Sequence, residues 1–218
     1  MPQQFPKGAN SLARATLAGA VALLVAAGWI GWWINQSPYL NSQGVPIDQP
    51  IPFSHQHHVS SDGLDCRYCH TSVEVSANAG MPDTQTCMTC HSHIWKDAPM
   101  LNPLRVSLAS GRPLRWRRVY DLPQYVFFDH SIHVRGGVGC VTCHGRVDQM
   151  PITWRATRPH MSQCMECHQH PERYLRPRSE VFDMDYAPPR NQDEFGRRLM
   201  RNYRIDPKVL SNCSTCHH

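Results

Sequence analysis

Residues 128–144 decide the fold of this chain and read Phe128-Asp129-His130-Ser131-Ile132-His133, then a glycine-rich turn, then Cys140-Val141-Thr142-Cys143-His144. The second part is a Cys-x-x-Cys-His sequence, the attachment pattern of c-type haem. Its two thiols can each bond one vinyl group of the same porphyrin, and the histidine that follows ligates the iron from the proximal side. The two histidines of the first part are three positions apart, so on a helix they share a face and can both reach haem iron. The stretch therefore predicts covalent haem with histidine on both sides of the iron.

The Cys-x-x-Cys-His pattern occurs five times and uses all ten cysteines of the chain. We number the motifs in chain order: motif 1 (66–70), motif 2 (87–91), motif 3 (140–144), motif 4 (164–168) and motif 5 (213–217). The predicted thioether ligands are Cys66, Cys69, Cys87, Cys90, Cys140, Cys143, Cys164, Cys167, Cys213 and Cys216. The predicted proximal iron ligands are His70, His91, His144, His168 and His217. Zinc sites combine two cysteine pairs, thioredoxin-like motifs occur singly, and disulfide scaffolds do not repeat one spacing, so five haem c groups are the prediction.

A second, longer repeat includes the Cys-x-x-Cys-His motif and the segment that precedes it. Phe53-Ser54-His55-Gln56-His57-His58 precedes motif 1 as Phe128-Asp129-His130-Ser131-Ile132-His133 precedes motif 3. The chain therefore reads as two units of one plan, 53–97 and 125–170, with a fifth haem motif in 203–218. The predicted distal ligands are His55, His58, His130 and His133.

Four distal histidines leave one of five irons without a second ligand. The candidates for the fifth position precede motif 4 and are His160, Met161 and Met150. A thioether ligand would raise the potential of that haem above the others. The remaining histidines are expected to face solvent or propionates, and they are His57, His93, His170 and His218.

The composition favours an irregular fold of short helices, because 18 prolines and 13 glycines in 218 residues interrupt regular structure and no alternating run indicates a sheet. Residues 53–218 are few for five porphyrins and an ordinary core as well. We therefore expect the porphyrins to supply most of the buried apolar surface and folding to follow haem attachment. The formal charge of +5 is offset by haem propionates, so we expect no nucleic-acid binding. Arginines 112, 115, 117 and 118 are expected to pair with propionates or with another subunit.

Residues 15–34 carry no charged side chain, and their number matches the ~20 residues that a helix needs to cross a bilayer. Trp29, Trp32 and Trp33 lie at the C-terminal end, where an interfacial aromatic belt is expected. A cleaved signal peptide is the alternative, but its apolar region would span only about 7–15 residues. The sequence thus predicts a transmembrane helix at 15–34, with residues 1–14 in the cytoplasm. A linker, 35–52, then leads to a pentahaem domain, 53–218, on the periplasmic side of a bacterial cytoplasmic membrane.

The two units resemble class III cytochromes of the c3/c7 kind. In those proteins the first histidine of such a pair binds the next haem along the chain, and the second reaches a more distant one. The resemblance implies that His55 serves the haem of motif 1 and His130 the haem of motif 3. His58 and His133 would then reach other haems.

Nearly the whole chain resembles the pentahaem cytochrome c subunit of alternative complex III. The likeness rests on the N-terminal helix, the two Phe-x-His-x-x-His segments, Leu64-Asp65-Cys66, Gly136-Gly137-Val138-Gly139-Cys140, Met184-Asp185-Tyr186-Ala187-Pro188-Pro189 and motif 5. It implies an electron-transfer subunit without a quinol site or catalytic residues of its own. The implied partners are polytopic quinol-binding membrane subunits, an iron–sulfur subunit and a monohaem cytochrome c.

Two other function classes compete with this interpretation. A membrane-anchored tetrahaem quinol dehydrogenase of the NapC/NrfH type would itself oxidise quinol at an open haem. A multihaem terminal reductase would need a vacant iron, and often a lysine in place of a motif histidine. All five motifs here keep histidine, which argues against a reductase.

Overall fold

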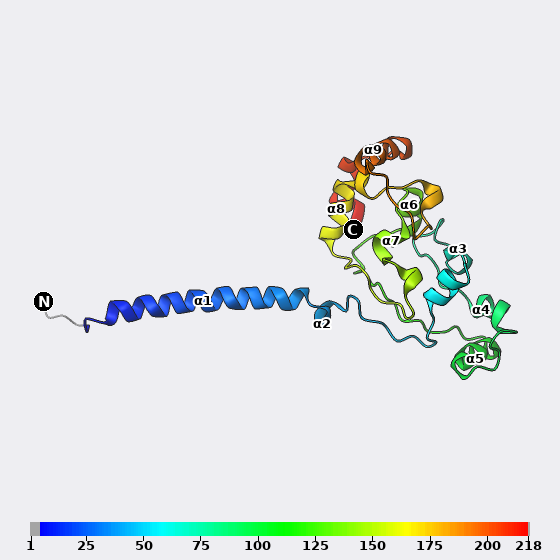
Figure 1. The fold of residues 1–218 in the computed structure, drawn as a ribbon, viewed down its shortest axis with the longest axis horizontal. Helices are drawn as coiled ribbons and strands as arrows, with labels where there is room; N and C mark the ends of the chain where they lie inside the picture. The colour runs from blue at the N-terminus through cyan, green and yellow to red at the C-terminus, as the bar shows by residue number, and fades with distance from the viewer. Residues whose placement is uncertain (1–4, 218) are drawn as a thin grey trace. The chain divides into compact units, whose positions relative to one another are not determined.

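The computed structural model describes residues 5–217, apart from the side chain of Tyr39, and divides into one compact unit up to Ser42 and another from Gln43 onward. Residues 1–4 of the predicted cytoplasmic tail and His218 lie outside the described residues. The part up to Ser42 contains the long helix α1 (Ala9–Gln36) followed by one turn, α2 (Pro38–Asn41) (Figure 1).

Helix α1 has the properties of a membrane span. Its 28 residues extend about 42 Å at ~1.5 Å per residue, more than the ~30 Å of a hydrocarbon core. None of its side chains is buried, and Leu24, Val25 and Trp29 are all exposed. Within the described residues it is the one helix that is long and apolar enough to cross a membrane. The helix begins before and ends after the predicted span at 15–34, so it contains that span.

The part of the chain from Gln43 onward consists of short helices joined by irregular segments (Figure 1). Its elements are η1 (Gln56–Ser61), α3 (Cys66–Cys69), α4 (Thr84–His91), η2 (Pro99–Leu101), α5 (Asn102–Ser110), α6 (His130–Arg135), α7 (Cys140–His144), η3 (Val147–Gln149), α8 (Met161–Gln169), η4 (Pro171–Arg173), η5 (Arg178–Glu180), α9 (Gln192–Tyr203), α10 (Pro207–Leu210) and α11 (Cys213–Cys216). Over residues 5–217 the backbone forms isolated bridges but no strand. This confirms the predicted irregular fold of short helices.

Each Cys-x-x-Cys pair lies in a helical turn, which puts the two cysteines of a motif on one face. Polar residues start several of these turns. Asp65 accepts a hydrogen bond from the amide of Arg67, Asp83 accepts one from Thr86, and Asn212 accepts one from Ser214. These are N-caps, which satisfy backbone donors that a short helix leaves free.

The chain's own hydrophobic core is small and consists of two clusters. Ile51, Leu101 and Leu104 form the first cluster, against which Cys87 and Met88 of motif 2 pack. Val73, Val134 and Val181 form the second, and Cys140 of motif 3 packs against it. Both clusters therefore lie beside haem-attachment cysteines.

Helix α9 buries Leu199, whereas the neighbouring Met200 is partly exposed. Gly196, which the sequence did not single out, is buried on the same helix. A Cβ atom added to Gly196 would collide with the backbone of Glu172 in η4. The glycine therefore permits the close packing of α9 on η4.

Candidate haem-binding sites

Three motif histidines each face a histidine of a Phe-x-His-x-x-His segment. The ring centroids lie 6.1 Å apart for His58 and His91, 6.3 Å for His130 and His144, and 6.2 Å for His133 and His168. At nitrogen–metal distances of about 2 Å, as in zinc-bound histidine, two imidazoles on opposite sides of one metal ion have ring centres about 6 Å apart. All three separations fit one iron between the two rings of each pair.

His55 lies close to His70, the proximal histidine of motif 1. Burial is the main cause that lowers the pKa of His55 to about 4, and the neighbouring His70 ring is the second. The structure therefore brings three of the four predicted distal histidines to the proximal histidines of motifs 2, 3 and 4, and it places His55 within electrostatic reach of His70 of motif 1.

Six of these eight imidazoles present the nitrogen that iron needs. A backbone carbonyl only accepts hydrogen bonds, so an Nδ1 bonded to a carbonyl carries the proton and leaves the lone pair on Nε2. The Nδ1–carbonyl pairs are His58–Ser54 (2.8 Å), His70–Gly80 (2.7 Å), His91–Ile94 (3.1 Å), His130–Ala77 (2.8 Å), His133–Asp129 (2.7 Å) and His168–Leu210 (3.0 Å). Bonds to a carbonyl orient a histidine ligand and fix its tautomer. Nδ1 of His55 instead pairs with the hydroxyl of Thr153 at 2.9 Å, and a hydroxyl can donate as well as accept.

In each unit, the ring of one phenylalanine contacts the rings of both distal histidines. The ring of Phe53 stands edge-on to His55 (5.0 Å, 89°) and stacks on His58 (4.5 Å, 21°). Phe128 stands edge-on to His130 (4.8 Å, 88°) and stacks on His133 (4.7 Å, 26°). The two segments thus share one geometry, which supports their origin as copies of a single plan.

Burial affects the titration of two thiols and one imidazole in motifs 3 and 4. It raises the pKa of Cys140 to about 11 and that of Cys167 to about 12, so both thiols are neutral at neutral pH. Burial also lowers the pKa of His144 to about 4, which keeps its imidazole in the neutral form that ligates metal.

Motif 5 differs from the other four. The ring that lies near His217 belongs to Tyr125, with centroids 5.9 Å apart, and the Tyr125 carbonyl is 3.4 Å from Nδ1. Over the described part of the chain no second histidine ring faces His217. Of the three candidates for the fifth distal position, His160 is exposed, Met161 is 61% exposed, and Met150 is buried at 2%. Their roles remain predictions.

The histidines expected to lie outside the iron sites have other partners. His57 contacts Asp62 at 3.5 Å and stacks on Trp95, and His170 contacts Glu172 at 3.5 Å. Both carboxylates lie near a ring nitrogen, as expected for imidazoles at a polar surface.

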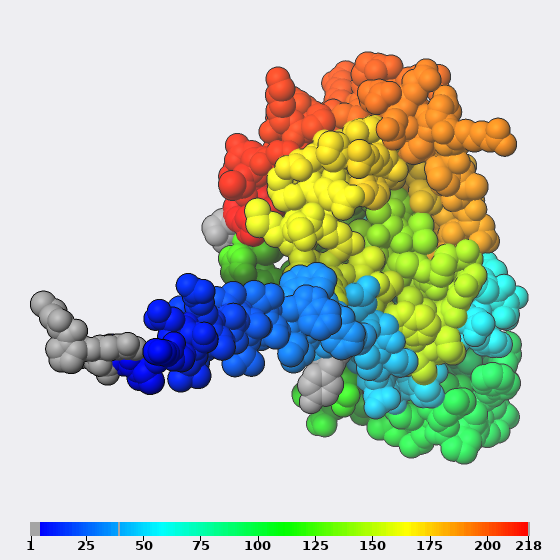
Figure 2. All heavy atoms as spheres, turned by 60° about the vertical axis from the view of Figure 1, so that its left-hand side comes forward, coloured from blue at the N-terminus to red at the C-terminus, as the bar shows by residue number. Residues whose placement is uncertain are grey.

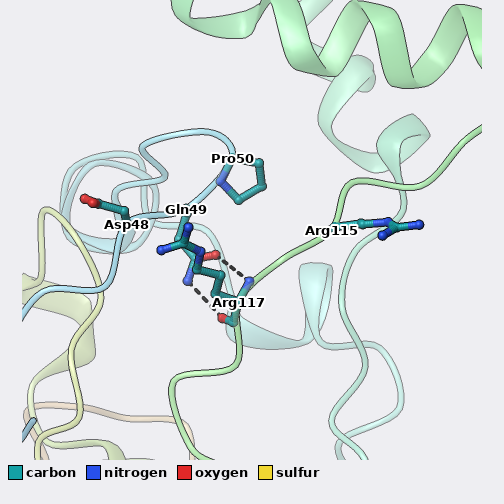
Figure 3. A pocket seen from close by; sticks show the side chains of 5 residues that line it. All are labelled: Asp48, Gln49, Pro50, Arg115 and Arg117. Carbon is teal, nitrogen blue, oxygen red and sulfur yellow. Dashed lines mark hydrogen bonds between the residues drawn. The ribbon is translucent and has the colours of Figure 1, made fainter.

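A small cavity of about 240 Å³ lies between the linker and the arginine-rich loop (Figure 3). Asp48, Gln49, Pro50, Arg115 and Arg117 line it. The side chain of Gln49 bonds both the amide and the carbonyl of Arg117, each at 2.9 Å, and so fastens the loop to the linker. None of the five Cys-x-x-Cys-His motifs contributes a residue to this lining.

Comparison with known proteins agrees with this geometry. Residues 34–102 match the class III cytochrome c family, and residues 126–218 match cytochrome c7 and related cytochrome c. The chain is also 27% identical over 197 residues to the "menaquinone reductase, multiheme cytochrome c subunit" of Nitratidesulfovibrio vulgaris (strain Hildenborough). The match covers 89% of this chain and 77% of that protein. Together with the short helices of the described residues, these matches show class III and c7-like multihaem cytochrome domains, with one apolar helix near the N-terminus.

Proposed function

We propose that this chain is the electron-transfer subunit of a membrane complex that exchanges electrons with quinone, and that it holds five haem c groups, one at each motif. The three histidine pairs with ring centroids 6.1–6.3 Å apart carry the proposal. Haem iron supplies a reversible one-electron change of valence. Histidines on both sides fill its coordination sphere and leave no position for a substrate.

We assign the distal ligands by these pairs. His55 serves motif 1, His58 motif 2, His130 motif 3 and His133 motif 4. Nδ1 of His58, His130 and His133 donates to a backbone carbonyl, so Nε2 is the ligand atom of these three, and Nδ1 of His55 is engaged by the hydroxyl of Thr153. For motif 5, His217 is the proximal ligand and its partner comes from His160, Met161 or Met150.

The complex that we propose contains a polytopic quinol-binding subunit, an iron–sulfur subunit and a monohaem cytochrome c. Within it the chain receives electrons from quinol oxidation through the iron–sulfur subunit and passes them to the monohaem cytochrome c or another periplasmic acceptor. The chain has no catalytic role of its own. Helix α1 anchors it in the cytoplasmic membrane of a bacterium, with the N-terminus inside and the haem domain outside. The resemblance to the pentahaem subunit of alternative complex III supports this arrangement.

A second candidate reverses the direction of electron flow. The relative from Nitratidesulfovibrio vulgaris is named as a menaquinone reductase subunit, which favours transfer from a periplasmic donor to quinone. The same ligands would serve either direction. The two candidates differ in what reduces the haems of the purified complex.

The test is purification of the full-length protein from membranes in mild detergent, followed by identification of the co-purifying subunits and a spin-state spectrum. We expect polytopic and iron–sulfur subunits, and low-spin haem with bis-histidine signatures. Reduction of these haems by quinol supports the first direction, and quinone reduction by a periplasmic cytochrome supports the second. A solitary protein that oxidises quinol at a high-spin haem would contradict the proposal.

A further inference from the structure

We infer that the two units are joined head to head through motifs 1 and 3, so that the five haem-attachment motifs stand in single file in the order 2–1–3–4–5. Motifs 2 and 5 are then the two ends of the file. The inference rests on the proposed function for its meaning, since the ends of a file are where an electron-transfer subunit meets its partners. Its geometry comes from contacts between the motifs.

The junction between the units is reciprocal. In the first unit, the amide of Gln56, next to His55, donates to the carbonyl of Met150 at 3.1 Å. In the second unit, the amide of Ser131, next to His130, donates to the carbonyl of Ser76 at 3.2 Å. Met150 and Ser76 occupy equivalent positions, each six residues after the proximal histidine of its own unit's first motif. Each unit therefore holds the distal segment of the other through the same backbone position.

The Nδ1 partners of His55 and His130 also come from the opposite unit. Nδ1 of His55 bonds Thr153, which follows motif 3, and Nδ1 of His130 bonds the carbonyl of Ala77, which follows motif 1. Self-complementary contacts of this kind are those of a two-fold interface, here formed within one chain. The loop 76–80 in addition orients His70 through the carbonyl of Gly80. One loop thus positions the proximal imidazole of motif 1 and the distal imidazole of motif 3.

Apolar contacts close the same junction. Val73, three residues after motif 1, packs with Val134 of α6 and with Val181, and Cys140 of motif 3 lies against this cluster. Motifs 1 and 3 are therefore neighbours through hydrogen bonds and through packing.

Within each unit, the two haem-attachment motifs are also neighbours: motif 1 of motif 2, and motif 3 of motif 4. The hydroxyl of Tyr68 in motif 1 lies 3.1 Å from that of Thr89 in motif 2, so the two Cys-x-x-Cys turns touch. In the second unit, α6 carries both His130, which faces motif 3, and His133, which faces motif 4. The file therefore extends outward from the junction in both directions.

Motif 5 continues the file beyond motif 4. Sγ of Cys216 lies 3.9 Å from Nδ1 of His168, and the carbonyl of Leu210 in α10 accepts from the same nitrogen at 3.0 Å. Helices α8 and α10 pack together, and Figure 2 shows the α8 segment lying against the C-terminal segment. Across the described residues, no hydrogen bond or ring contact joins motif 2 to motifs 3, 4 or 5, or motif 5 to motif 1.

A structure of the haem-loaded, full-length protein by electron cryo-microscopy in detergent tests the order directly. We expect each iron to have its nearest neighbours in the order 2–1–3–4–5, with the irons of motifs 2 and 5 farthest apart. An iron of motif 2 nearest to motif 3 or 4, or a compact cluster without ends, would overturn the inference. This outcome is independent of whether quinone reacts with the complex, so the order and the proposed function can fail separately.

A pair of threonine variants tests whether the second unit positions the distal imidazole of motif 1. Thr153→Val removes the hydroxyl bonded to His55 and should shift the electron paramagnetic resonance signal and the potential of the haem at motif 1, although Thr153 follows motif 3. Thr157→Val removes a hydroxyl that bonds the carbonyl of Cys143 and should instead affect the haem at motif 3. If Thr153→Val altered the signal and the potential of the haem at motif 3 alone, Thr153 would not position the distal imidazole of motif 1, and the inference would be contradicted at that contact.

Discussion

At the scale of single residues, the orientation of the imidazoles carries the chemistry. His130 bonds a carbonyl through Nδ1 and faces His144 at 6.3 Å. His130→Ala removes that ring, so we expect one of the haems to become high-spin. The matched control is His170→Ala, because the His170 imidazole contacts Glu172 at 3.5 Å and, in the described part of the chain, makes no ring contact with another histidine. Electron paramagnetic resonance of the oxidised protein distinguishes the two, and equal high-spin signals in both variants would contradict the ligand assignment.

A second prediction concerns Asp148, whose buried carboxylate accepts two hydrogen bonds from Arg146, at 2.7 and 3.0 Å. These bonds are the largest cause that lowers the pKa of Asp148. A lowered pKa in the folded state stabilises the protein above the unfolded value of about 3.9, and this stability is lost as the pH falls through the folded pKa.

We therefore expect Asp148→Asn to lower the free energy of unfolding by about 1.5–3 kcal/mol at neutral pH, and by less in acid. Denaturant unfolding at several pH values measures the difference. The control is Asp121→Asn, which breaks an exposed pair with Arg118 and should cost at most about 1 kcal/mol. A loss for Asp148→Asn that does not shrink in acid would exclude the ion pair as its cause.

At the scale of elements, the packing of α9 depends on Gly196. Gly196→Ala would place a Cβ atom against the backbone of Glu172, so α9 must move away from η4. We expect a loss of about 1–3 kcal/mol, the usual cost of overpacking a tight contact. Arg197→Ala, at an exposed position of the same helix, should be nearly neutral. Thermal unfolding of the two variants side by side measures the difference, and equal stability would show that the contact relaxes freely.

Helix α1 leads to a prediction about the membrane. Replacing the chain up to Gln36 with a cleavable signal peptide removes every residue of the apolar helix. We expect the remaining domain to appear in the soluble periplasmic fraction with its haems attached, because the part from Gln43 onward is a compact unit with its own contacts and carries all five motifs. Cell fractionation with haem staining is the measurement. Retention in salt-washed membranes that lack the partner subunits would show a second membrane attachment.

Elements were predictable where a local signal marks them. The uncharged run at 15–34 predicted an apolar helix, which lies within α1, and the many prolines and glycines predicted short helices without a sheet. The two Phe-x-His-x-x-His segments look alike in sequence, yet the first continues into η1, with wider turns, and the second into α6. Ser60 of η1 bonds the carbonyl of Asp148, a contact far along the chain that no local pattern contains. Tertiary context decides such a difference.

The predicted haem ligands also differ in how local their sequence signal is. The cysteines and proximal histidines are predicted from a spacing of a few residues, so the sequence alone suffices to propose them. The meeting of His58 with His91 and of His133 with His168 depends on how the chain folds back. The reciprocal junction uses the backbone carbonyls of Met150 and Ser76, and a carbonyl has no residue-specific signature. That junction was invisible in the sequence for this reason.

At the scale of the whole molecule, the small core explains why haem must be part of the fold. The two clusters of buried aliphatic side chains sit beside Cys87 and Cys140, and many motif residues are only partly buried. Porphyrins bonded at these cysteines would cover apolar surface that the polypeptide leaves open. Burial of that surface is the main source of folding free energy, so attachment and folding are coupled.

The number of covalent haems is the most direct test of this interpretation. Intact-mass spectrometry of the mature polypeptide, purified from membranes of cells with a working cytochrome c maturation system, measures it in one step. We expect the mass of the chain plus five haems, and a loss of one haem when Cys213 and Cys216 are both replaced by alanine. A mature polypeptide with fewer than five haems, or with none attached covalently, would contradict it.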